Sequence, residues 1–490
     1  VRLHQVAGAQ IIPPSALGGL AERQNVQAVA REFGANLVLT TTLWRSSGQI
    51  RASYSLLNPA GRQIASGTVH GTIGNLFDFG DLIAERIAGS LELPRLPVPN
   101  RGGLRTAEVQ DRFFQAVGAM HRYDDPASVD FAIALLEPMA EANPESALLH
   151  AALGRAYRAK YALTSDSAWA ERAIETSRRA ARLDRSLPEV HVTLGQLLIM
   201  TGRFDDAAAE LRQALAMRPD DPEAMLWLGQ ALDQAGESDE AESTYRAAIA
   251  LRPTYWAGYN KLGIFYLLRG RFDDAIRMLS EVARLTPDNH RGLSNLGAAQ
   301  MFSGDFESAA ASFQRAIEVA PAAPGFSNLG TCLYYLHRFD EARAAFEKAV
   351  ELAPADFRLW LNLADAYRWT GQPDEEREAR DKGIELARRS LEINPNDPAT
   401  HGQLVLSYAL LGSEAQARRH LDRALSLAPD NPNVLIKAAI LAEWEGDSAK
   451  ALDWITRAVA AGYSKPMLAN DPELRDLRGH PSFQKLIAPS

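Results

Sequence analysis

The stretch "WAGYNKLGIFYLLRGRFDDAIRMLSEVARLTPDN" (residues 256–289) indicates the fold most clearly, because its pattern predicts two amphipathic helices and the turn between them. In its first half, Tyr259, Leu262 and Tyr266 recur at the three- and four-residue spacing of one helix face. Gly270 then supplies the permissive backbone that a tight turn requires. The stretch therefore predicts a helical hairpin.

The rest of this stretch predicts how the two helices meet. Gly263 allows the neighbouring helix to approach closely, and Phe272 is expected to fill the space between the helices. Asp273 and Asp274 stand in the first turn of the second helix, where the helix dipole favours acidic side chains. Pro287 ends the unit, because proline cannot continue a helix interior.

Variants of one phrase recur along the chain: "TGRFDDAA" (201–208), "RGRFDDAI" (269–276), "SGDFESAA" (303–310) and "LHRFDEAR" (336–343). The prolines that close the units are Pro219, Pro253, Pro287 and Pro321, each 34 residues after the last, followed by Pro354, Pro395 and Pro429. This period resembles that of the tetratricopeptide repeat (TPR). The resemblance implies a mainly α fold, a right-handed superhelix of about ten helical hairpins.

Ten units follow from this frame: 111–146, 147–187, 188–221, 222–255, 256–289, 290–322, 323–356, 357–397, 398–431 and 432–465. Units 147–187 and 357–397 are 41 residues long, and the additional residues fit either longer helices or longer loops. Residues 466–490 break the period, and their polar character fits a cap over the last apolar face of the array.

The first hundred residues predict a different structure. "NLVLTTTLWR" (36–45), "QIRASYSLLN" (49–58) and "RQIASGTVHG" (62–71) alternate between apolar and polar residues and are joined by turns, which predicts a three-strand meander. A short strand, "GAQIIPP", and a helix over residues 25–34 are expected before it, and a further helix after it. The order β-α-β-β-β-α predicts a small α+β domain with helices on one face of the sheet.

The predicted organisation has four parts: the α+β domain (1–93), a Pro/Gly linker (94–110), the TPR array (111–465) and the C-terminal cap (466–490). No stretch has about 18 uninterrupted apolar residues, so no membrane span is predicted. The chain begins with Val1, which is typical of a processed protein or a fragment.

Composition narrows the class of partner. The net charge is −9, and neither the first hundred residues nor the remainder has the dense basic face that a nucleic-acid backbone requires. The single cysteine, Cys332, permits neither an internal disulfide nor a thiolate metal cluster.

One tripeptide, Asp78-Phe79-Gly80, matches the magnesium-binding signature of protein kinases. Phosphoryl transfer also needs a strand lysine and an upstream catalytic loop, but the first lysine of the chain is Lys160. The segment instead predicts a short amphipathic helix with Asp81 near its start. The apolar face of that helix is expected to comprise Phe77, Leu82, Ile83, Ile87 and Leu91.

The chain as a whole resembles the region that follows the kinase domain and membrane helix in a class of bacterial serine/threonine protein kinases. The residues that carry the resemblance are "REFGANLVLTTTLWRSSGQIRASYSLLNPAGRQIASGTV" (31–69), "YWAGYNKLGIFY" (255–266) and "AAGYSKPMLANDPELRDLRGHPSFQKLI" (460–487). It implies a TolB-N-terminal-like (FlgO-like) domain followed by TPRs, in an extracytoplasmic, periplasmic sensing or scaffolding region. A cytoplasmic location is the alternative.

No motif predicts catalysis, a metal site or a cofactor. The ten histidines include no pair at helical metal-ligand spacing, and His191 and His401 occupy a position where the repeat places a large aromatic. Cys332 is expected to be a buried small side chain rather than a nucleophile. "GFSNLG" (325–330) lacks the second glycine of a nucleophile elbow. The chain is therefore not expected to be an enzyme.

A binding groove is the positive prediction. The first helix of each unit is expected to form the inner wall of the superhelix, with positions 2, 5, 9 and 12 of the unit on one face. The candidates are Glu189, Glu223, Asn260, Ile264, Leu267, Arg291, Met301, Tyr334, Arg358, Asp365 and Arg368. The wall is expected to change from acidic, through apolar, to a mixed region with arginines, which fits a peptide with apolar anchors and charges of both signs.

Two functions follow from these observations. The first is a non-catalytic scaffold or sensor region that binds a protein or peptide partner and belongs to a larger assembly. The alternative is a regulatory region of a bacterial Ser/Thr protein kinase whose catalytic domain is not in this chain. The sequence specifies neither the partner nor the oligomeric state.

Overall fold

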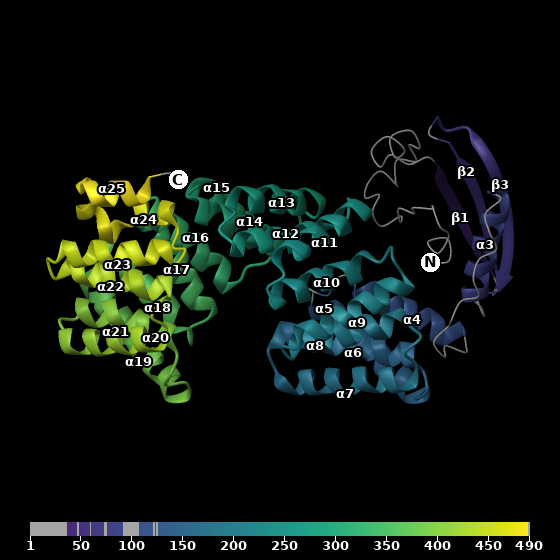
Figure 1. Cartoon of the computed structure of the whole chain (residues 1–490), viewed down its shortest axis with the longest axis horizontal. Helices are drawn as coiled ribbons and strands as arrows, with labels where there is room; N and C mark the ends of the chain where they lie inside the picture. Colours follow the sequence, from purple (N-terminus) through teal and green to yellow (C-terminus); the bar gives the residue numbers. More distant parts are fainter. Residues whose placement is uncertain are drawn as a thin grey trace. The chain divides into compact units, whose positions relative to one another are not determined.

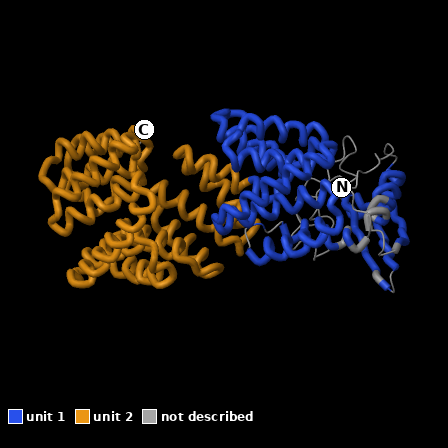
Figure 2. The backbone as a smooth tube through the Cα atoms, turned by 90° about the horizontal axis from the view of Figure 1, so that it is seen from below, with its two compact units in different colours: residues 1–258 blue, residues 259–490 orange. Residues whose placement is uncertain are grey.

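The computed structural model describes residues 37–46, 49–58, 60–72, 76–91, 107–120, 123 and 126–488. The chain divides into two compact units, residues 1–258 (unit 1) and residues 259–490 (unit 2), shown in different colours in Figure 2. The described part is mostly helical, with one small sheet near the N-terminus, which confirms the predicted fold class.

The sheet consists of three strands: β1 (Val38–Ser46), β2 (Gln49–Leu57) and β3 (Gln63–Thr72). Both pairings are antiparallel and the spatial order is β1-β2-β3, so the predicted meander is confirmed (Figure 1). The strand and helix predicted before the meander lie outside the described residues.

Helix α3 (Leu76–Ser90) packs against the sheet and contains the Asp-Phe-Gly tripeptide. Phe79 of this tripeptide is 6% exposed, whereas Leu82, which was expected on the buried face, is 38% exposed. Gly71 explains the difference, since a Cβ atom there would lie 2.3 Å from the Phe79 ring. The absence of a side chain on Gly71 admits Phe79, and the helix turns Phe79 and Ile87 toward Tyr54 and the other core residues of the sheet.

Unit 1 continues with four helical hairpins. Their helices are α4 (Ala107–Ala119), α5 (Pro126–Ala142), α6 (Ala147–Thr164), α7 (Ser167–Leu183), α8 (Pro188–Met200), α9 (Phe204–Met217), α10 (Pro222–Ala235) and α11 (Ser238–Leu251). Helix α12 (Trp256–Leu268) crosses the division between the two units.

Unit 2 contains the remaining helices: α13 (Phe272–Leu285), α14 (His290–Ser303), α15 (Phe306–Val319), α16 (Ala323–Tyr335), α17 (Phe339–Leu352), α18 (Phe357–Trp369), α19 (Pro373–Ile393), α20 (Pro398–Leu410), α21 (Glu414–Leu427), α22 (Pro432–Trp444) and α23 (Ser448–Ala460). Three short elements follow: α24 (Lys465–Asn470), the 3-10 helix η5 (Pro472–Gly479) and α25 (Pro481–Ile487). No helix in the described part of the chain is both long and apolar enough to cross a membrane.

A glycine in the first helix of a hairpin sets how closely the second helix can approach. A Cβ atom on Gly263 would lie 2.6 Å from Cγ of Leu279, and one on Gly330 would lie 2.7 Å from the Phe346 ring. In the turn that follows, Gly270 adopts a left-handed φ of +70°, as glycine does at low cost. The close approach at Gly263 and the turn at Gly270 agree with the prediction from residues 256–289.

The two units of 41 residues contain longer helices rather than longer loops. Helices α6 and α7 have 18 and 17 residues, and α19 has 21. Arg380 on α19 is fully buried and pairs with Asp365 on α18 and with Glu376 one turn earlier. The longer helix therefore buries a charge that two carboxylates neutralise.

The elements after α23 cover the apolar face of the last hairpin. Leu468, Leu474 and Phe483 are fully buried in one cluster with Ile440 of α22 and Ile455 of α23. Burial of each such side chain contributes about 1.5–3 kcal/mol to folding. This packing removes from water the apolar surface that an open array would otherwise expose at its end.

Candidate functional site

The first helices of successive hairpins in unit 2 lie side by side, and we call the surface they form the first-helix face. Contacts join α14 to α16, α16 to α18, and α18 to α20. Side chains 35 residues apart hydrogen-bond along it: Asn295 donates to Asn260 at 2.9 Å, and the Trp369 indole N–H donates to the Tyr334 hydroxyl at 3.0 Å. The repeat thus brings side chains of successive first helices close enough to hydrogen-bond with one another.

A part of the chain itself occupies this face. The C-terminal segment, residues 464–479, lies against α14, α16 and α18. Ser464 Oγ donates a hydrogen bond of 2.7 Å to the carbonyl oxygen of Phe302 at the end of α14. Pro466 lies over Gly304, the residue that ends this helix.

The segment places one apolar side chain into the face. Met467 is buried in a cluster with Met301 on α14, Phe306 and Phe313 on α15, and Cys332 on α16. The thioether is flexible and polarisable, which fits a pocket lined by aromatic rings and a second methionine. This cluster is the apolar part of the interface between the C-terminal segment and the first-helix face.

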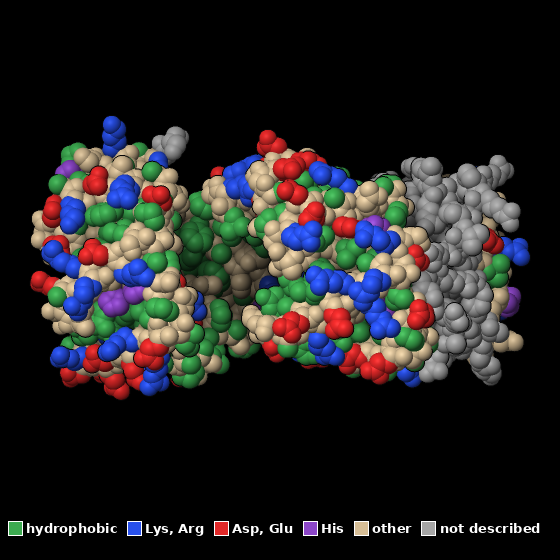
Figure 3. Space-filling model, turned by 60° about the horizontal axis from the view of Figure 1, so that its bottom comes forward, with side chains coloured by type: hydrophobic (Ala, Val, Ile, Leu, Met, Phe, Trp, Pro, Cys, Tyr) green, Lys and Arg blue, Asp and Glu red, His purple; other side chains and the backbone are tan. Residues whose placement is uncertain are grey.

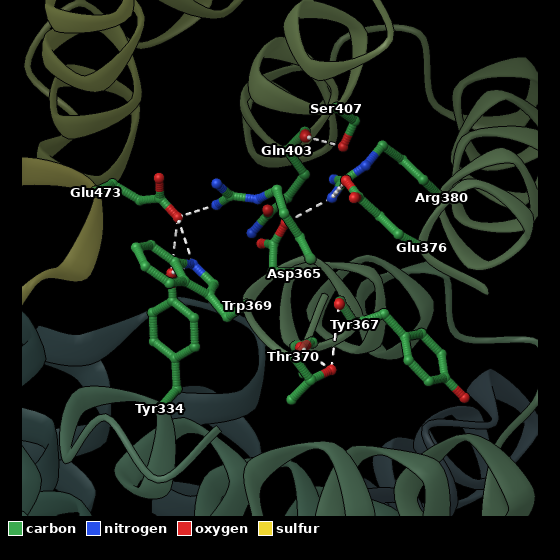
Figure 4. Close-up of polar contacts among 12 residues, drawn as sticks. Tyr334, Asp365, Tyr367, Trp369, Thr370, Glu376, Arg380, Gln403, Ser407 and Glu473 are labelled. Atoms are coloured by element: carbon green, nitrogen blue, oxygen red, sulfur yellow. Dashed lines mark hydrogen bonds and ion pairs between the residues drawn. The ribbon is translucent and has the colours of Figure 1, made fainter. Parts of the chain in front are cut away.

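Glu473 forms the polar part of this interface. Its Oε1 atom accepts hydrogen bonds from the Tyr334 hydroxyl at 2.8 Å and from the Trp369 indole at 3.1 Å, and it forms an ion pair with Arg368 (Figure 4). The Arg475 guanidinium lies 5.7 Å from the centre of the Trp369 ring. We call Tyr334, Arg368 and Trp369 the carboxylate pocket.

Burial strengthens these contacts. The Glu473 side chain is 11% exposed, and its charge is balanced by Arg368, which is 24% exposed. The pKa of Tyr334 is raised well above its ordinary value, because the hydroxyl is buried and because the carboxylates of Glu473, Asp471 and Asp365 surround it. The hydroxyl therefore remains a proton donor to Glu473 at any physiological pH.

Asp471 lies in the segment between Met467, which makes the apolar contact, and Glu473, which makes the polar contacts. Its carboxylate accepts the backbone N–H of Glu473 at 3.0 Å and so begins η5. Burial raises its pKa to about 6, and Glu473 adds to this shift, while the Glu473 N–H, Lys437 and Arg478 oppose it. The site thus contains one carboxyl group that changes charge under mildly acidic conditions.

The structure brings three of the predicted groove residues together. Met301, Tyr334 and Arg368 occupy position 12 of three successive units, and all three contact the C-terminal segment. Asp365, which was also predicted, pairs with the buried Arg380 of α19, and its own side chain is 39% exposed.

The other predicted residues of unit 2 do not contact the segment through any hydrogen bond or ion pair found among the described residues. Arg291 and Arg358 are exposed, Arg358 pairing with Asp356. Ile264 and Leu267 are half-buried on α12, and Asn260 is bonded to Asn295.

In unit 1 the predicted acidic wall is neutralised, which corrects the expectation of an acidic surface. Glu223 pairs with Arg155 on α6, and Glu189 pairs with Arg218 at the end of α9. Nearby, Arg158 lies over the Trp227 ring at 4.5 Å, and burial together with Arg155 lowers its pKa to about 10. Salt bridges, rather than free carboxylates, therefore line this part.

Sequence reasoning missed the partners supplied by the C-terminal segment and by α18. Trp369 follows Arg368 directly, but it stands at position 13 of its unit, one residue beyond the predicted groove positions 2, 5, 9 and 12. Glu473 stands in "NDPEL", which signals only the start of a helical turn. Arg155 and Arg158 occupy positions 9 and 12 of their unit, so the same rule would have identified them.

The histidines at the aromatic position of the repeat are packing residues with hydrogen bonds. His401 Nε2 lies 3.1 Å from the carbonyl oxygen of Pro395, as Trp360 Nε1 lies 2.8 Å from that of Pro354. Because a carbonyl only accepts, His401 donates from Nε2, and its Nδ1 then accepts from Nδ1 of His420 at 2.8 Å. Burial, followed by the charge effects of His401 and nearby arginines, lowers the pKa of His420 to about 4.

No catalytic arrangement emerges from the described residues. Cys332 is buried, and burial raises its pKa to about 12, so its thiol is not a nucleophile at neutral pH. The described part of the chain has no group of three or more His, Cys, Asp or Glu residues placed to hold a metal ion. Figure 3 shows positive and negative side chains interspersed over the described surface in view, without one large basic field.

Comparisons with known proteins agree with this architecture. A family model described as tetratricopeptide repeat matches residues 192–255 and 261–325, and a second model of the same description matches residues 323–356. No curated protein matches the chain.

Several solved structures are similar to parts of the chain. They include MamA (25% identity, 34% of this chain and 97% of that chain, TM-score 0.33) and a thermophilic TPR protein of Thermus thermophilus (27% identity, 36% and 98%, TM-score 0.31). A third is YrrB, described as a TPR protein with an unusual peptide-binding site (21% identity, 36% and 93%, TM-score 0.33).

Proposed function

Because this is a tetratricopeptide-repeat protein, we propose that it is a non-catalytic scaffold that binds a protein or peptide partner on its first-helix face. Proteins of this repeat are generally non-catalytic scaffolds. Stacked repeats present an extended surface on which many side chains can contact one bound chain.

One observation carries the proposal: the first-helix face of unit 2 already holds a polypeptide segment. Residues 464–479 are held by a hydrogen bond to the α14 backbone, by an apolar pocket and by the carboxylate pocket. These are the contacts with which a groove recognises a peptide, namely backbone hydrogen bonds for affinity and side-chain pockets for specificity.

The exposed residues of the face suggest the character of the partner. Arg291 and Arg358 lie at the starts of α14 and α18, and Ile264 and Leu267 are partly accessible on α12. A peptide with apolar anchors and acidic side chains would complement this set, because arginine pairs readily with carboxylates.

A charge-reversal comparison tests the proposal in the full chain. The test variant carries Arg291→Glu and Arg358→Glu on first helices. The matched control carries Arg315→Glu and Arg377→Glu, which are exposed on the second helices α15 and α19. Both pairs change the net charge equally, so differences in binding report the location of the charge.

The readout is affinity purification from the native source with quantitative mass spectrometry. We expect a partner that the wild type and the control retain and the test variant loses. Equal retention by all three proteins, or equal loss by both variants, would contradict binding on the first-helix face.

We also propose, as a second candidate, that the chain is the sensor region of a bacterial Ser/Thr protein kinase and lies outside the cytoplasm. The observation that favours it is the antiparallel meander with α3 on one face, followed by helical repeats, which is the order that the resemblance implies. Intact mass and N-terminal sequencing of the native protein test it. A native chain that begins with a kinase domain supports this candidate, and one without a kinase domain rejects it.

A further inference from the structure

We propose that the carboxylate pocket recognises an acidic side chain of the peptide partner, and that Glu473 is an internal occupant which the partner must displace. This inference rests on the proposed function and extends it, since it specifies both the ligand chemistry and how access to the site is controlled.

The pocket is built for a carboxylate. A hydroxyl, an indole N–H and a guanidinium converge on one oxygen of Glu473, and they come from two successive first helices, α16 and α18. Trp369 is itself held by stacking on Phe339 at 4.9 Å and by its bond to Tyr334. Donors fixed in this way bind a charged acceptor more strongly than mobile surface donors do.

The C-terminal segment has two interfaces of different character. Its leucines, Leu468, Leu474 and Leu477, are buried with α22 and α23 and close the end of the array. On the side of the first-helix face, Ser464 and Glu473 form the polar contacts and Met467 is buried in an apolar cluster. The second interface can therefore open while the first remains packed.

The spacing of these contacts describes the ligand. Met467 and Glu473 are six residues apart, and the serine that bonds to the α14 backbone stands three residues before Met467. The partner is accordingly a peptide with a hydroxyl residue, a flexible apolar residue three positions later and a glutamate six positions after that. The chain's own sequence, "SKPMLANDPELRDLRG" (464–479), is one such peptide.

Internal occupancy limits access by mass action. The segment is covalently attached to the last repeat, so its effective concentration at the pocket exceeds that of a dilute free peptide. A free peptide of the same sequence should therefore bind only after the internal Glu473 contact has been weakened. Because of this competition, an acidic ligand whose affinity is too low to displace Glu473 does not bind.

The test uses the full chain and a fluorescein-labelled peptide of residues 464–479 as the probe. The variant Glu473→Lys places a positive charge against Arg368 and opens the contact. The matched control, Asp476→Lys, makes the same charge change three residues later, at a side chain that is 77% exposed. Fluorescence anisotropy measures binding of the peptide to each protein.

We expect the peptide to bind the Glu473→Lys chain at least tenfold more tightly than the wild type or the Asp476→Lys chain. A peptide carrying Glu473→Gln should bind that chain at least tenfold more weakly, whereas one carrying Asp476→Asn should bind within about twofold of the original. If circular dichroism shows that Glu473→Lys unfolds the protein, Glu473→Gln in the chain serves the same comparison.

Equal peptide binding by all three chains, or no loss of binding with the Glu473→Gln peptide, overturns the inference. The proposed function is judged separately by the arginine reversals. If the Arg291→Glu and Arg358→Glu variant loses a partner, the proposed scaffold function is supported even when the peptide experiment fails. If the arginine reversals have no effect on partner binding, the scaffold function is rejected even when the peptide binds.

Discussion

Gly304 and Pro466 lie in direct contact although 162 residues separate them: a Cβ atom on Gly304 would lie 2.5 Å from Cβ of Pro466. Gly304 ends α14 in the left-handed region, with φ at +91°. The position thus excludes a side chain for two reasons, the backbone conformation and the C-terminal segment above it.

The variant Gly304→Ala separates these two reasons when it is compared with Gly236→Ala. Gly236 ends α10 with φ at +88°, and a Cβ atom there would meet nothing within 4 Å. Left-handed strain should cost each variant about 1 kcal/mol, and the clash with Pro466 should cost Gly304→Ala about 1–3 kcal/mol more. Chemical denaturation measures the free energies of unfolding. Equal losses would show that the segment does not press on α14.

Asp471 should make the stability of unit 2 depend on pH. Its pKa of about 6 in the folded state exceeds the ordinary value of 3.8, so the folded state binds more protons between these values. The contribution of this carboxyl is present below pH 4 and is lost as the pH rises through 6. Asp471→Asn retains an acceptor for the Glu473 N–H and should gain about 1–3 kcal/mol relative to the wild type between pH 4 and pH 7. A constant difference across this range would contradict the burial of an ionising group.

His420 should make the stability of the fold decrease as the pH falls, which is opposite to the effect of Asp471. Its pKa of about 4 lies below the ordinary 6.5, so its contribution is present above pH 6.5 and is lost as the pH falls through 4. In His420→Gln the amide can still donate to His401 but does not titrate. Relative to this variant, the wild type should lose about 1–2 kcal/mol between pH 7 and pH 4, a range reduced for solvent screening. Thermal melts of both proteins at several pH values provide the measurement, and parallel profiles would contradict the lowered pKa of His420.

Substitutions of first-helix glycines by alanine should change stability in opposite directions, according to the space around each glycine. Gly263→Ala should destabilise the fold by about 2–4 kcal/mol, because the new methyl group would meet Leu279 at 2.6 Å. Gly402→Ala, where the nearest atom is Val434 Cγ2 at 3.6 Å, should gain up to about 1 kcal/mol from helix propensity. Urea unfolding of the two variants compares them. A neutral result for Gly263→Ala would mean that the two helices can separate without cost.

The repeat could be predicted because each unit folds from local signals. The turn at Gly270 and the packing glycine at Gly263 each act within one hairpin, and both have counterparts in the structure. The three segments predicted as strands correspond to β1, β2 and β3. The exception, Leu82, shows where local periodicity fails, since the space made by Gly71 on another element determined which face of α3 is buried.

The candidate site could be predicted only in part from the sequence. Position 12 identified Met301, Tyr334 and Arg368 as neighbours on one surface, because stacking brings equivalent positions together. The contacts of Tyr334 and Arg368 with Glu473 depend on the path of the array over more than a hundred residues, which no single unit encodes. Likewise, the sequence does not show that the charge of Glu223 is neutralised, because its partner Arg155 lies 68 residues earlier.

The hydrogen bond from Ser464 to Phe302 also changes how unit 2 should fold. In a linear array of repeats each unit contacts only its neighbours, so the ends fray and folding proceeds from any local nucleus. Here a bond between residues 162 apart joins the end of the array to an earlier hairpin and closes the intervening repeats into a ring. Ring closure costs chain entropy that is recovered only when all the hairpins between are in place. Unit 2 should therefore unfold as one cooperative body, and its last repeat should exchange backbone hydrogens no faster than its middle.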